Sequence, residues 1–466
     1  MNHTTTIRSE VEQFMEREQL KLSDLGRMTG LNVGTLSSVI TGGKIMAINQ
    51  LDRITSIMGL PEGHFYEIYI QDNITANQPN WRRIRPFIFR CAQLNKMEYI
   101  QQIVSWLLDN PIYCIVLFDG AEELLQEEHK DAAALIYEAV AVTERSQHSE
   151  RLALCQYRLF TIRISDDQMQ NLRIAAQFEP YVERLDEILQ LDALKDLANL
   201  YRSLRKWDKL DNFAERMGTK ARMNYFSERR KAVSDEDSHH KLSRPLFVYI
   251  AYSDLLRGEV CHELGDYQRA LQFISGYADL DWVKESDEET LHWKGLFKEW
   301  AKTNAYVTKL FSGDLSVLMD YVSYIDTQKD DILLSLLNIA ELANRFNIDA
   351  APIFKHFAHE ISLLMDSKDT PGMNNTRLKS ERLARLFYEL SEYYLHKGEY
   401  EIGYKYLLKS LAKSTTINYD TIVVKCVGLF ETFRKYASTD TQSEYQKLFK
   451  EVHQSEKKNR VTTNRI

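Results

Sequence analysis

LSDLGRMTGLNVGTLSSVITGGK, residues 22–44, has the spacing of two short helices joined by a tight turn. Gly26 is small at the place where the second helix must approach the first, and Gly30 stands at the turn, where glycine tolerates a positive φ. Asn32 is a suitable cap for the second helix. The apolar residues of that helix recur at helical spacing and are Leu36, Val39 and Ile40. Together these features predict a helix-turn-helix.

Apolar periodicity predicts further helices around this motif, over residues 7–15, 48–58 and 64–70. Five short helices, with TGGK at residues 41–44 after the third, resemble the lambda-repressor-like (Cro/XRE) DNA-binding domain. We assign residues 1–70 to this domain, called the head below. The alternative is a small helical domain that only packs or dimerises.

The resemblance implies that the second helix of the motif enters the major groove of DNA. Val33, Gly34 and Ser38 stand where the family usually places side chains that read bases, and none of them can form a bidentate pair with a base. Val33 can touch a thymine methyl group, and Ser38 can bond to any base. This composition favours weak specificity at each half-site, helped by dimerisation or by DNA shape. The residues expected at the DNA, including those placed to hold phosphates, are Asn32, Val33, Gly34, Thr35, Ser37, Ser38, Thr41 and Lys44.

Charge around the motif is weakly positive. Residues 21–60 contain four basic side chains and two acidic ones, which is a small excess of positive charge for a nucleic-acid binder. A denser basic cluster follows in WRRIR, residues 81–85, where Arg82 and Arg83 are candidates for contact with the phosphate backbone. The alternative for this cluster is the solvated start of a helix that faces acidic neighbours.

The amino-acid composition limits the possible fold and function of the rest of the chain. Its 466 residues include only 8 prolines and 18 glycines, which favours long helices over a sandwich or a barrel. The net charge of −8 excludes a protein coated by nucleic acid along its whole length but permits a small DNA-binding head on an acidic body. No apolar run reaches the length of a membrane span, and the amino terminus, MNHTTTIRSEVEQ, lacks the apolar core of a signal peptide. We therefore expect a cytoplasmic protein without membrane contact.

The sequence offers little reactive chemistry. Five scattered cysteines without a C-x-x-C pair predict buried free thiols. His239 and His240 follow acidic residues, but this stretch is more typical of a polar loop than of a metal site. The whole sequence contains no glycine-rich phosphate loop, nucleophile elbow or H-E-x-x-H motif. We therefore expect no metal, no cofactor and no enzymatic activity.

The region after the head is predicted to be almost entirely helical. Residues 71–80, QDNITANQPN, are polar and predict a linker, and residues 81–437 beyond them show helical periodicity nearly throughout. Two polar stretches, 223–244 and 368–375, predict exposed loops. Residues 438–466 are expected to form a closing helix and a polar tail.

Internal repeats organise this region. Residues 251–284 and 384–417 follow one scheme, in which Gly258 stands where two helices cross and Ala270 is its small partner on the second helix. The scheme resembles the tetratricopeptide repeat (TPR), although Cys261 replaces the usual tyrosine. Weaker copies are expected in residues 121–142 and 197–217. An irregular helical bundle is the alternative.

TPR-like hairpins stack into a superhelix, and the first helix of each hairpin lines a concave groove that can bind an extended peptide or a partner helix. Asparagine suits such a groove because its amide both donates and accepts hydrogen bonds, as a peptide group does. Each candidate taken singly is more often a solvated surface residue. The residues expected to face the groove are Asn199, Arg202, Tyr252, Asn304, Asn338, Glu341 and Asn344.

A Cro-like head followed by a long TPR-like array resembles the RRNPP peptide-pheromone receptors of Gram-positive bacteria and their phages. The resemblance implies a cytoplasmic homodimer that takes part in quorum sensing. It implies that a short imported signalling peptide binds in the groove and changes the binding of the two heads to a palindromic double-stranded operator. The alternative is a TPR scaffold that regulates a partner protein without binding specific DNA.

Overall fold

The computed structural model describes residues 6–41, 44–145, 150–227, 242–327, 331–366, 374–417 and 419–450. Within these ranges every regular element is a helix and no strand forms, so the predicted all-α fold class is confirmed. In the described ranges, no helix is both long enough and apolar enough to span a bilayer. The chain folds as two compact units, Met1–Ala193 and Leu194–Ile466, and each is described by itself.

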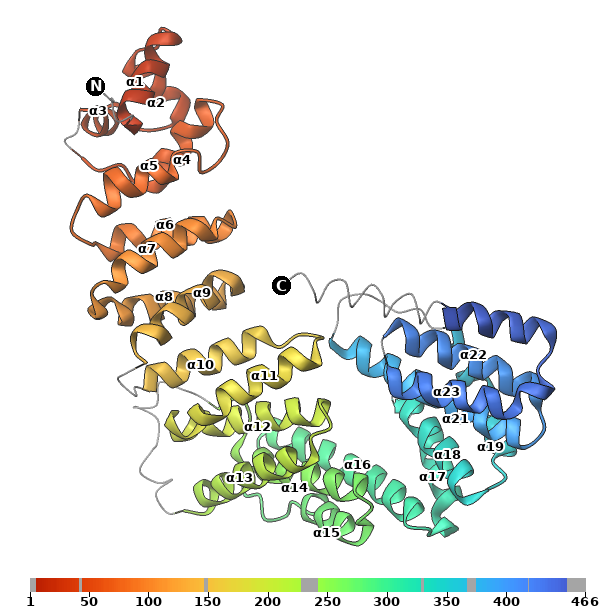
Figure 1. Cartoon of the computed structure of the whole chain (residues 1–466). Coiled ribbons are helices and arrows are strands. Elements are labelled where there is room, and N and C mark those ends of the chain that lie inside the picture. Colours follow the sequence, from red (N-terminus) through yellow and green to blue (C-terminus); the bar gives the residue numbers. More distant parts are fainter. Residues whose placement is uncertain are drawn as a thin grey trace. The chain divides into compact units, whose positions relative to one another are not determined.

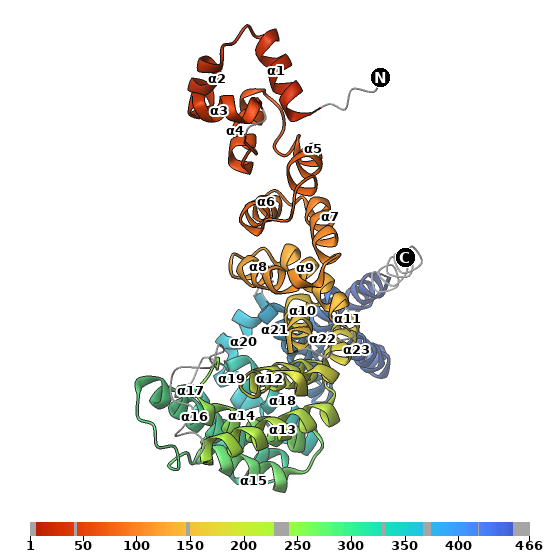
Figure 2. The ribbon, with the colours of Figure 1, turned by 90° about the vertical axis from the view of Figure 1, so that its left-hand side faces the viewer.

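The first unit begins with the head (Figures 1 and 2). Its core is built from fully buried side chains that include Val11, Leu25, Leu36 and Leu51. The first four helices form where the apolar spacing predicted them, and the fifth is shorter than predicted. The head helices are α1 (Ile7–Arg17), α2 (Leu22–Thr29), α3 (Val33–Ile40), α4 (Ile48–Ile57) and α5 (Tyr66–Tyr69).

The turn between α2 and α3 depends on its two glycines. Gly30 follows α2 with a φ of 67°, the left-handed conformation that glycine adopts readily. A Cβ atom on Gly26 would lie 3.0 Å from the carbonyl oxygen of Leu31 and 3.2 Å from Cγ2 of Val33. The predicted reasons for both glycines, a positive φ and a close approach, are therefore confirmed.

The expected linker at residues 71–80 is partly structured. The chain continues from α5 into the π-helix η1 (Ile70–Thr75), and only residues 76–80 lack helical structure. Ile70 and Ile74 are buried because they lie one turn apart on the face that meets the core, and Asn73 is buried beside them, while Gln71 and Asp72 are exposed. The non-helical connection, residues 76–80, is therefore shorter than the predicted linker.

Helical hairpins follow the head in the first unit, and Figure 1 shows them one after another along the chain. One hydrophobic core runs without interruption from Ile7 in α1 to Leu159 in α10. The helices of this part are α6 (Trp81–Gln93), α7 (Met97–Leu108), η2 (Pro111–Tyr113), α8 (Cys114–Gln126), α9 (Lys130–Thr143), α10 (Glu150–Arg163), α11 (Gln168–Phe178) and η3 (Glu179–Arg184). The boundary between the units falls within α12 (Glu187–Ser203).

The second unit consists of further hairpins closed by a carboxyl-terminal helix over residues 439–450. In that closing part, Tyr445 stacks on Phe430 with ring centroids 3.7 Å apart. The helices before it are α13 (Trp207–Phe226), α14 (Leu246–Glu263), α15 (Tyr267–Ala278), α16 (Glu288–Phe311), η5 (Leu315–Val317), α17 (Leu318–Thr327), α18 (Ile332–Phe346), α19 (Ala351–His356), α20 (Ala358–Asp366), α21 (Asn374–His396), α22 (Tyr400–Thr416), α23 (Asp420–Phe433) and η7 (Arg434–Tyr436).

Five hairpin turns share one backbone geometry. In each, one residue has a positive φ, and the next backbone N–H donates to the carbonyl five residues before it, as in a Schellman motif. The Lys96 N–H to Cys91 carbonyl and Asp266 N–H to Cys261 carbonyl distances are both 2.8 Å. The residues with positive φ are Asn95, Glu128, Arg205, Gly265 and Gly398. The shared geometry supports the predicted hairpin scheme at 251–284 and 384–417 and at both weaker copies.

The small residues of the scheme allow close helix packing. A Cβ atom on Gly403 would lie 2.7 Å from side-chain atoms of Leu395, whereas one on Gly258 would be at ordinary contact distance, 3.4 Å from Cβ of Phe273 and 3.7 Å from the carbonyl oxygen of Ala270. All five cysteines are buried free thiols, as predicted. Much of the two predicted loops, residues 228–241 and 367–373, lies outside the described residues, although α13 extends to Phe226.

Candidate nucleic-acid interface and polar belt

Helix α3 is the candidate DNA-contacting element of the head. Asn32 caps it by accepting a hydrogen bond from the backbone N–H of Gly34 at 2.8 Å. Leu36 and Val39 are buried against the head, so the opposite side of the helix faces outward. Gly34 is exposed on that side, and Val33, three positions before the buried Leu36 and close to Gly26 of α2, is 43% exposed at the edge between the two sides.

The polar side chains at the end of α3 bond largely within the helix. The Ser38 hydroxyl donates to the carbonyl of Gly34 at 3.0 Å, and the Thr41 hydroxyl donates to the carbonyl of Ser37 at 2.8 Å. Lys44 is exposed beyond the helix, and the two glycines of TGGK, Gly42 and Gly43, lie outside the described residues. Thr35 and Ser37 are partly exposed on the same helix.

The basic cluster at the start of α6 is only partly available to a ligand. Arg82 is exposed, whereas Arg83 donates from Nη1 to the carbonyl oxygen of Asn73 in η1 at 3.1 Å. Arg85 forms an ion pair with Glu123. The alternative interpretation, the start of a helix that faces acidic neighbours, therefore applies to Arg85. Of Arg82 and Arg83, the two residues predicted to contact DNA phosphates, Arg82 is the more accessible.

A second candidate site lies in the second unit, where side chains of successive first helices meet. We call it the polar belt: Asn199, Arg202, Tyr252, Glu259, Glu263, Glu341, Asn344, Arg385 and Glu389. It includes five of the seven residues predicted to face a groove. Asn304 and Asn338 lie outside it, since their amides donate to the hydroxyls of Tyr277 at 2.9 Å and Tyr321 at 3.4 Å on the preceding helices.

The belt begins between α12 and α14. The Tyr252 hydroxyl donates to Oδ1 of Asn199 at 2.6 Å. Arg202 binds Glu259 with two contacts, Nε to Oε1 at 2.8 Å and Nη2 to Oε2 at 2.6 Å. Such a bidentate pair fixes both side chains. Burial raises the pKa of Tyr252, so this hydroxyl stays protonated and keeps its hydrogen bond to Asn199.

The belt continues between α18 and α21. Asn344 donates from Nδ2 to both the backbone oxygen of Glu389, at 2.9 Å, and its Oε2, at 2.8 Å. One turn away, Glu341 pairs with Arg385. Burial raises the pKa of Glu389 to about 7, and the neighbouring Glu341 carboxylate acts in the same direction.

Glu263 at the end of α14 connects the two halves electrostatically. Its side chain is exposed, yet surrounding protein desolvates it and raises its pKa, while Arg385 and Arg205 act in the opposite direction. A carboxylate that is both solvent-accessible and desolvated is typical of a recessed surface. The belt thus offers paired charges, amides and a tyrosine hydroxyl along one run of helices.

Sequence reasoning missed Glu259, Glu263, Arg385 and Glu389. A signal for them was present, because each stands three, four or seven positions from another belt residue on its own helix, the spacing of a single face. What the sequence lacked was the register between helices, which decides which faces meet. No group of histidine, cysteine or carboxylate side chains in the described ranges could hold a metal ion; His239 and His240 fall outside those ranges.

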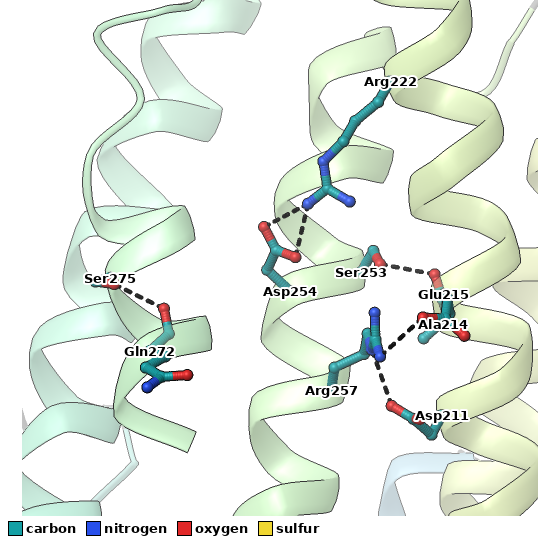
Figure 3. A network of polar contacts seen from close by, with 9 residues as sticks. All are labelled: Asp211, Ala214, Glu215, Arg222, Ser253, Asp254, Arg257, Gln272 and Ser275. Carbon is teal, nitrogen blue, oxygen red and sulfur yellow. Dashed lines mark hydrogen bonds and ion pairs between the residues drawn. The ribbon is translucent and has the colours of Figure 1, made fainter. Parts of the chain in front are cut away.

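The opposite side of α14 is occupied by contacts with α13 (Figure 3). Arg222 binds both oxygens of Asp254 at 2.7 and 2.8 Å, and Arg257 binds Asp211 at 2.9 Å. The buried Ser253 hydroxyl donates to the carbonyl of Ala214 at 2.7 Å. These bonds tie the two helices together on the side of α14 that lies opposite its polar belt residues.

No family model and no curated protein matches the chain. Among solved structures, Bacillus thuringiensis PlcR in complex with the peptide PapR7 and DNA aligns with 95% of this chain and 98% of that chain, at 11% identity and a TM-score of 0.14. A TM-score this low carries no argument about function, so the proposal below rests on the residues of this chain.

Proposed function

We propose that this chain is a transcriptional regulator that binds operator DNA through its head and is controlled by a short signalling peptide at the polar belt. The observation that carries the proposal is the helix-turn-helix geometry of α2 and α3. The two helices turn at Gly30, α3 is capped by Asn32, and its inner side is buried while Gly34 and, at the edge, Val33 are exposed. An outward helix of this kind fits the major groove.

The chemistry of the polar belt supports a peptide as the ligand. Asn199 and Asn344 each present an amide, and Tyr252 adds a hydroxyl, beside carboxylates that are already held by arginines. An extended peptide needs donors and acceptors for its backbone and charges for its ends. The regulator would act in the cytoplasm as a homodimer on a palindromic operator, since twofold symmetry in the protein requires twofold symmetry in the DNA.

A specific observation also favours the scaffold alternative. The outward side of α3, from Asn32 to Thr41, carries no charged side chain, which is unusual for a surface that meets phosphates. In that case the head would bind a partner protein, and the belt would still receive a peptide or a helix.

Selection of random DNA duplexes by the purified full-length protein at low salt separates the two. We expect an enriched palindrome, and we expect Ser38→Glu to weaken its binding at least about tenfold because a carboxylate would face phosphates. Gln101→Glu, which adds the same charge at an exposed position of α7, is the control. If the folded protein enriches no sequence, the regulator proposal is wrong and the scaffold is favoured.

Peptide control is tested by repeating the selection with short peptides extracted from cultures of the host organism. We expect occupancy of the enriched operator to change with the extract. Asn344→Ala, which removes both bonds to Glu389, should abolish this response and leave binding without extract unchanged. An operator whose occupancy ignores the extract would contradict peptide control while DNA binding still stands.

A further inference from the structure

Arg345, in the last turn of α18, places its guanidinium among three aromatic rings. Its Cζ atom lies 5.6 Å from the ring centroid of Tyr267 at the start of α15 and 5.7 Å from that of Phe311 at the end of α16. The ring of Phe346, the next residue on α18, is 5.3 Å away. Aromatic faces attract cations, so these contacts hold the guanidinium beside the rings although the arginine is solvent-exposed.

Hydrogen bonding and packing fix the guanidinium further. Nη1 of Arg345 donates to the hydroxyl of Tyr267 at 2.7 Å. Tyr267 packs edge-on against the ring of His262, which also meets the ring of Phe311. Nδ1 of His262 lies 3.2 Å from the hydroxyl oxygen of the buried Thr308. The arginine therefore rests on a packed base, and its remaining N–H groups keep one orientation.

The charge of Arg345 is not neutralised by a neighbouring side chain. In the described ranges, no carboxylate lies within ion-pair distance of its guanidinium. The Tyr267 oxygen accepts the bond from Arg345, and its own proton has no acceptor among the described residues. By contrast, several arginines on neighbouring helices of the second unit each bind a carboxylate: Arg202, Arg222, Arg257 and Arg385.

The neighbouring residues place this guanidinium at one end of the polar belt. Arg345 follows Asn344 directly and stands one turn after Glu341, so it lies on the belt side of α18. His262, in the same cluster, stands one turn after Glu259 on α14. A ligand that lies along the belt would therefore reach the guanidinium with one of its ends.

A carboxylate is the group that fits this cluster. A guanidinium presents parallel N–H groups that match the two oxygens of a carboxylate, and the Tyr267 hydroxyl adds a further donor. Helices α14, α16 and α18 all end here, and the partial negative charge of their carboxyl ends disfavours an anion with more than one charge. The carboxyl terminus of a peptide carries a single charge, and it is the one carboxylate that every peptide has.

We propose that Arg345 and Tyr267 bind the carboxyl terminus of the signalling peptide and thereby set the direction in which the peptide lies along the polar belt. This inference rests on the proposed function, in which the belt receives a peptide. A peptide with a free carboxyl end should therefore bind, and the same peptide with an amidated end should bind far more weakly.

The test uses two synthetic libraries of short random peptides, one with free and one with amidated carboxyl ends. Each library is passed over the immobilised full-length protein, and retained peptides are identified by mass spectrometry. The affinity of each retained sequence is then measured in both forms. We expect amidation to weaken binding at least about tenfold, because hydrogen bonds between charged groups are lost.

Variants assign the effect to the cluster. Arg345→Gln should bind the free and amidated forms equally, and Tyr267→Phe, which keeps the ring and removes the hydroxyl, should reduce the difference between them. Arg269→Gln is the matched control, because Arg269 is an exposed arginine of α15 that also lies beside an aromatic ring, that of Phe273. It should keep the full preference for the free end. Thermal unfolding of each variant shows whether it folds, and the two peptide forms test the unmodified protein even if Arg345→Gln does not.

The outcomes are distinguishable. Retained peptides that bind equally well with either end, or a folded Arg345→Gln variant that still prefers the free end, overturn this inference and leave the proposed function standing. Amidated peptides that depend on Arg345 through an internal aspartate or glutamate also overturn it. If the folded protein retains no peptide from either library, control by a peptide is overturned together with this inference. A preference for the free end that disappears in Arg345→Gln and persists in Arg269→Gln supports both.

Discussion

Glu389 shows how a single residue of the polar belt connects burial with binding chemistry. Burial raises its pKa to about 7, and Asn344 holds its carboxyl group in place. The folded protein therefore retains this proton at pH values where an unfolded chain, with a usual pKa of 4.5, has lost it. Near neutral pH the belt exists in two protonation states, and a ligand that pairs with the carboxylate would favour one of them.

Glu389→Gln is predicted to flatten the pH dependence of stability. Because the folded-state pKa is raised, the stabilisation is fully present below pH 4.5 and is lost as pH rises through about 7. Between pH 5 and pH 8 the unmodified protein should lose up to about 3 kcal/mol more unfolding free energy than the variant. Urea unfolding at several pH values measures this difference.

The control for this prediction is Glu401→Gln, at an exposed position of α22. It should follow the unmodified protein at every pH. If the curves of Glu389→Gln and the unmodified protein run parallel from pH 5 to pH 8, the proposed proton on Glu389 is absent.

At the scale of elements, the hairpin turns show what a repeat demands of its sequence. Gly265 has a φ of 81°, and a Cβ atom there would meet nothing within 4 Å, so any cost of a side chain would come from the backbone conformation alone. Gly295, in the middle of α16, has equally open surroundings but lies in an ordinary helix. The two positions therefore separate conformation from packing.

Gly265→Ala is predicted to destabilise the second unit by about 1–2 kcal/mol, the cost of a left-handed conformation for a residue with a Cβ atom. Gly295→Ala should instead stabilise it by about 0.5–1 kcal/mol, because alanine loses less conformational entropy in a helix. Chemical unfolding of the two variants side by side gives both numbers. Effects of the same sign would mean that φ does not decide the outcome.

These turns also explain how far the sequence could predict the fold. The hairpins with Gly265 and Gly398 were evident, because glycine marks the left-handed position directly. Asn95, Glu128 and Arg205 adopt the same left-handed conformation although they are not glycines, because the packing of their hairpins outweighs the energetic cost of that backbone conformation. Weak repeats were therefore visible from apolar spacing alone, and their turns were not.

The polar belt was predictable to a similar extent. Helical spacing identified Asn199, Arg202 and Tyr252, which do meet across α12 and α14. It could not separate them from Asn304 and Asn338, which bond to tyrosines of the preceding helices, α15 and α17. The difference depends on the rotation of each helix about its axis, which side chains distant in sequence determine.

At the scale of the first unit, the head and the hairpins share one core and are not separate bodies on a tether. Tyr69 of α5 donates to the carbonyl of Met46 at 2.9 Å and stacks on Phe87 of α6 with centroids 5.3 Å apart. Asp52 of α4 accepts the Tyr66 hydroxyl at 2.9 Å. These contacts join α6 to the head within one packed core.

Arg90 of α6 also connects the head to the first hairpin, and replacing Arg90 tests this connection. Nε of Arg90 donates to Asp52 at 2.7 Å and Nη2 donates to Glu62 at 2.8 Å, with the Arg90 side chain 28% and the Asp52 side chain 19% exposed. Arg90→Met should cost about 2 kcal/mol of unfolding free energy, since it leaves a half-buried carboxylate without its cation. Amide hydrogen exchange in α4 and α5 should accelerate in the same variant.

Arg17→Met is the matched comparison for Arg90→Met. Arg17 forms an ion pair with the neighbouring Glu18, and the two side chains are 70% and 48% exposed. Because exposed pairs contribute little, its loss should change stability by less than about 0.5 kcal/mol and leave exchange in α4 and α5 unchanged. If both variants behave alike, the ion pair between Arg90 and Asp52 does not help to hold the head. If only Arg90→Met loosens α4 and α5, the ion pair at Asp52 links the head to the first hairpin, and the same variant should then weaken the response of operator binding to peptide without removing operator binding itself.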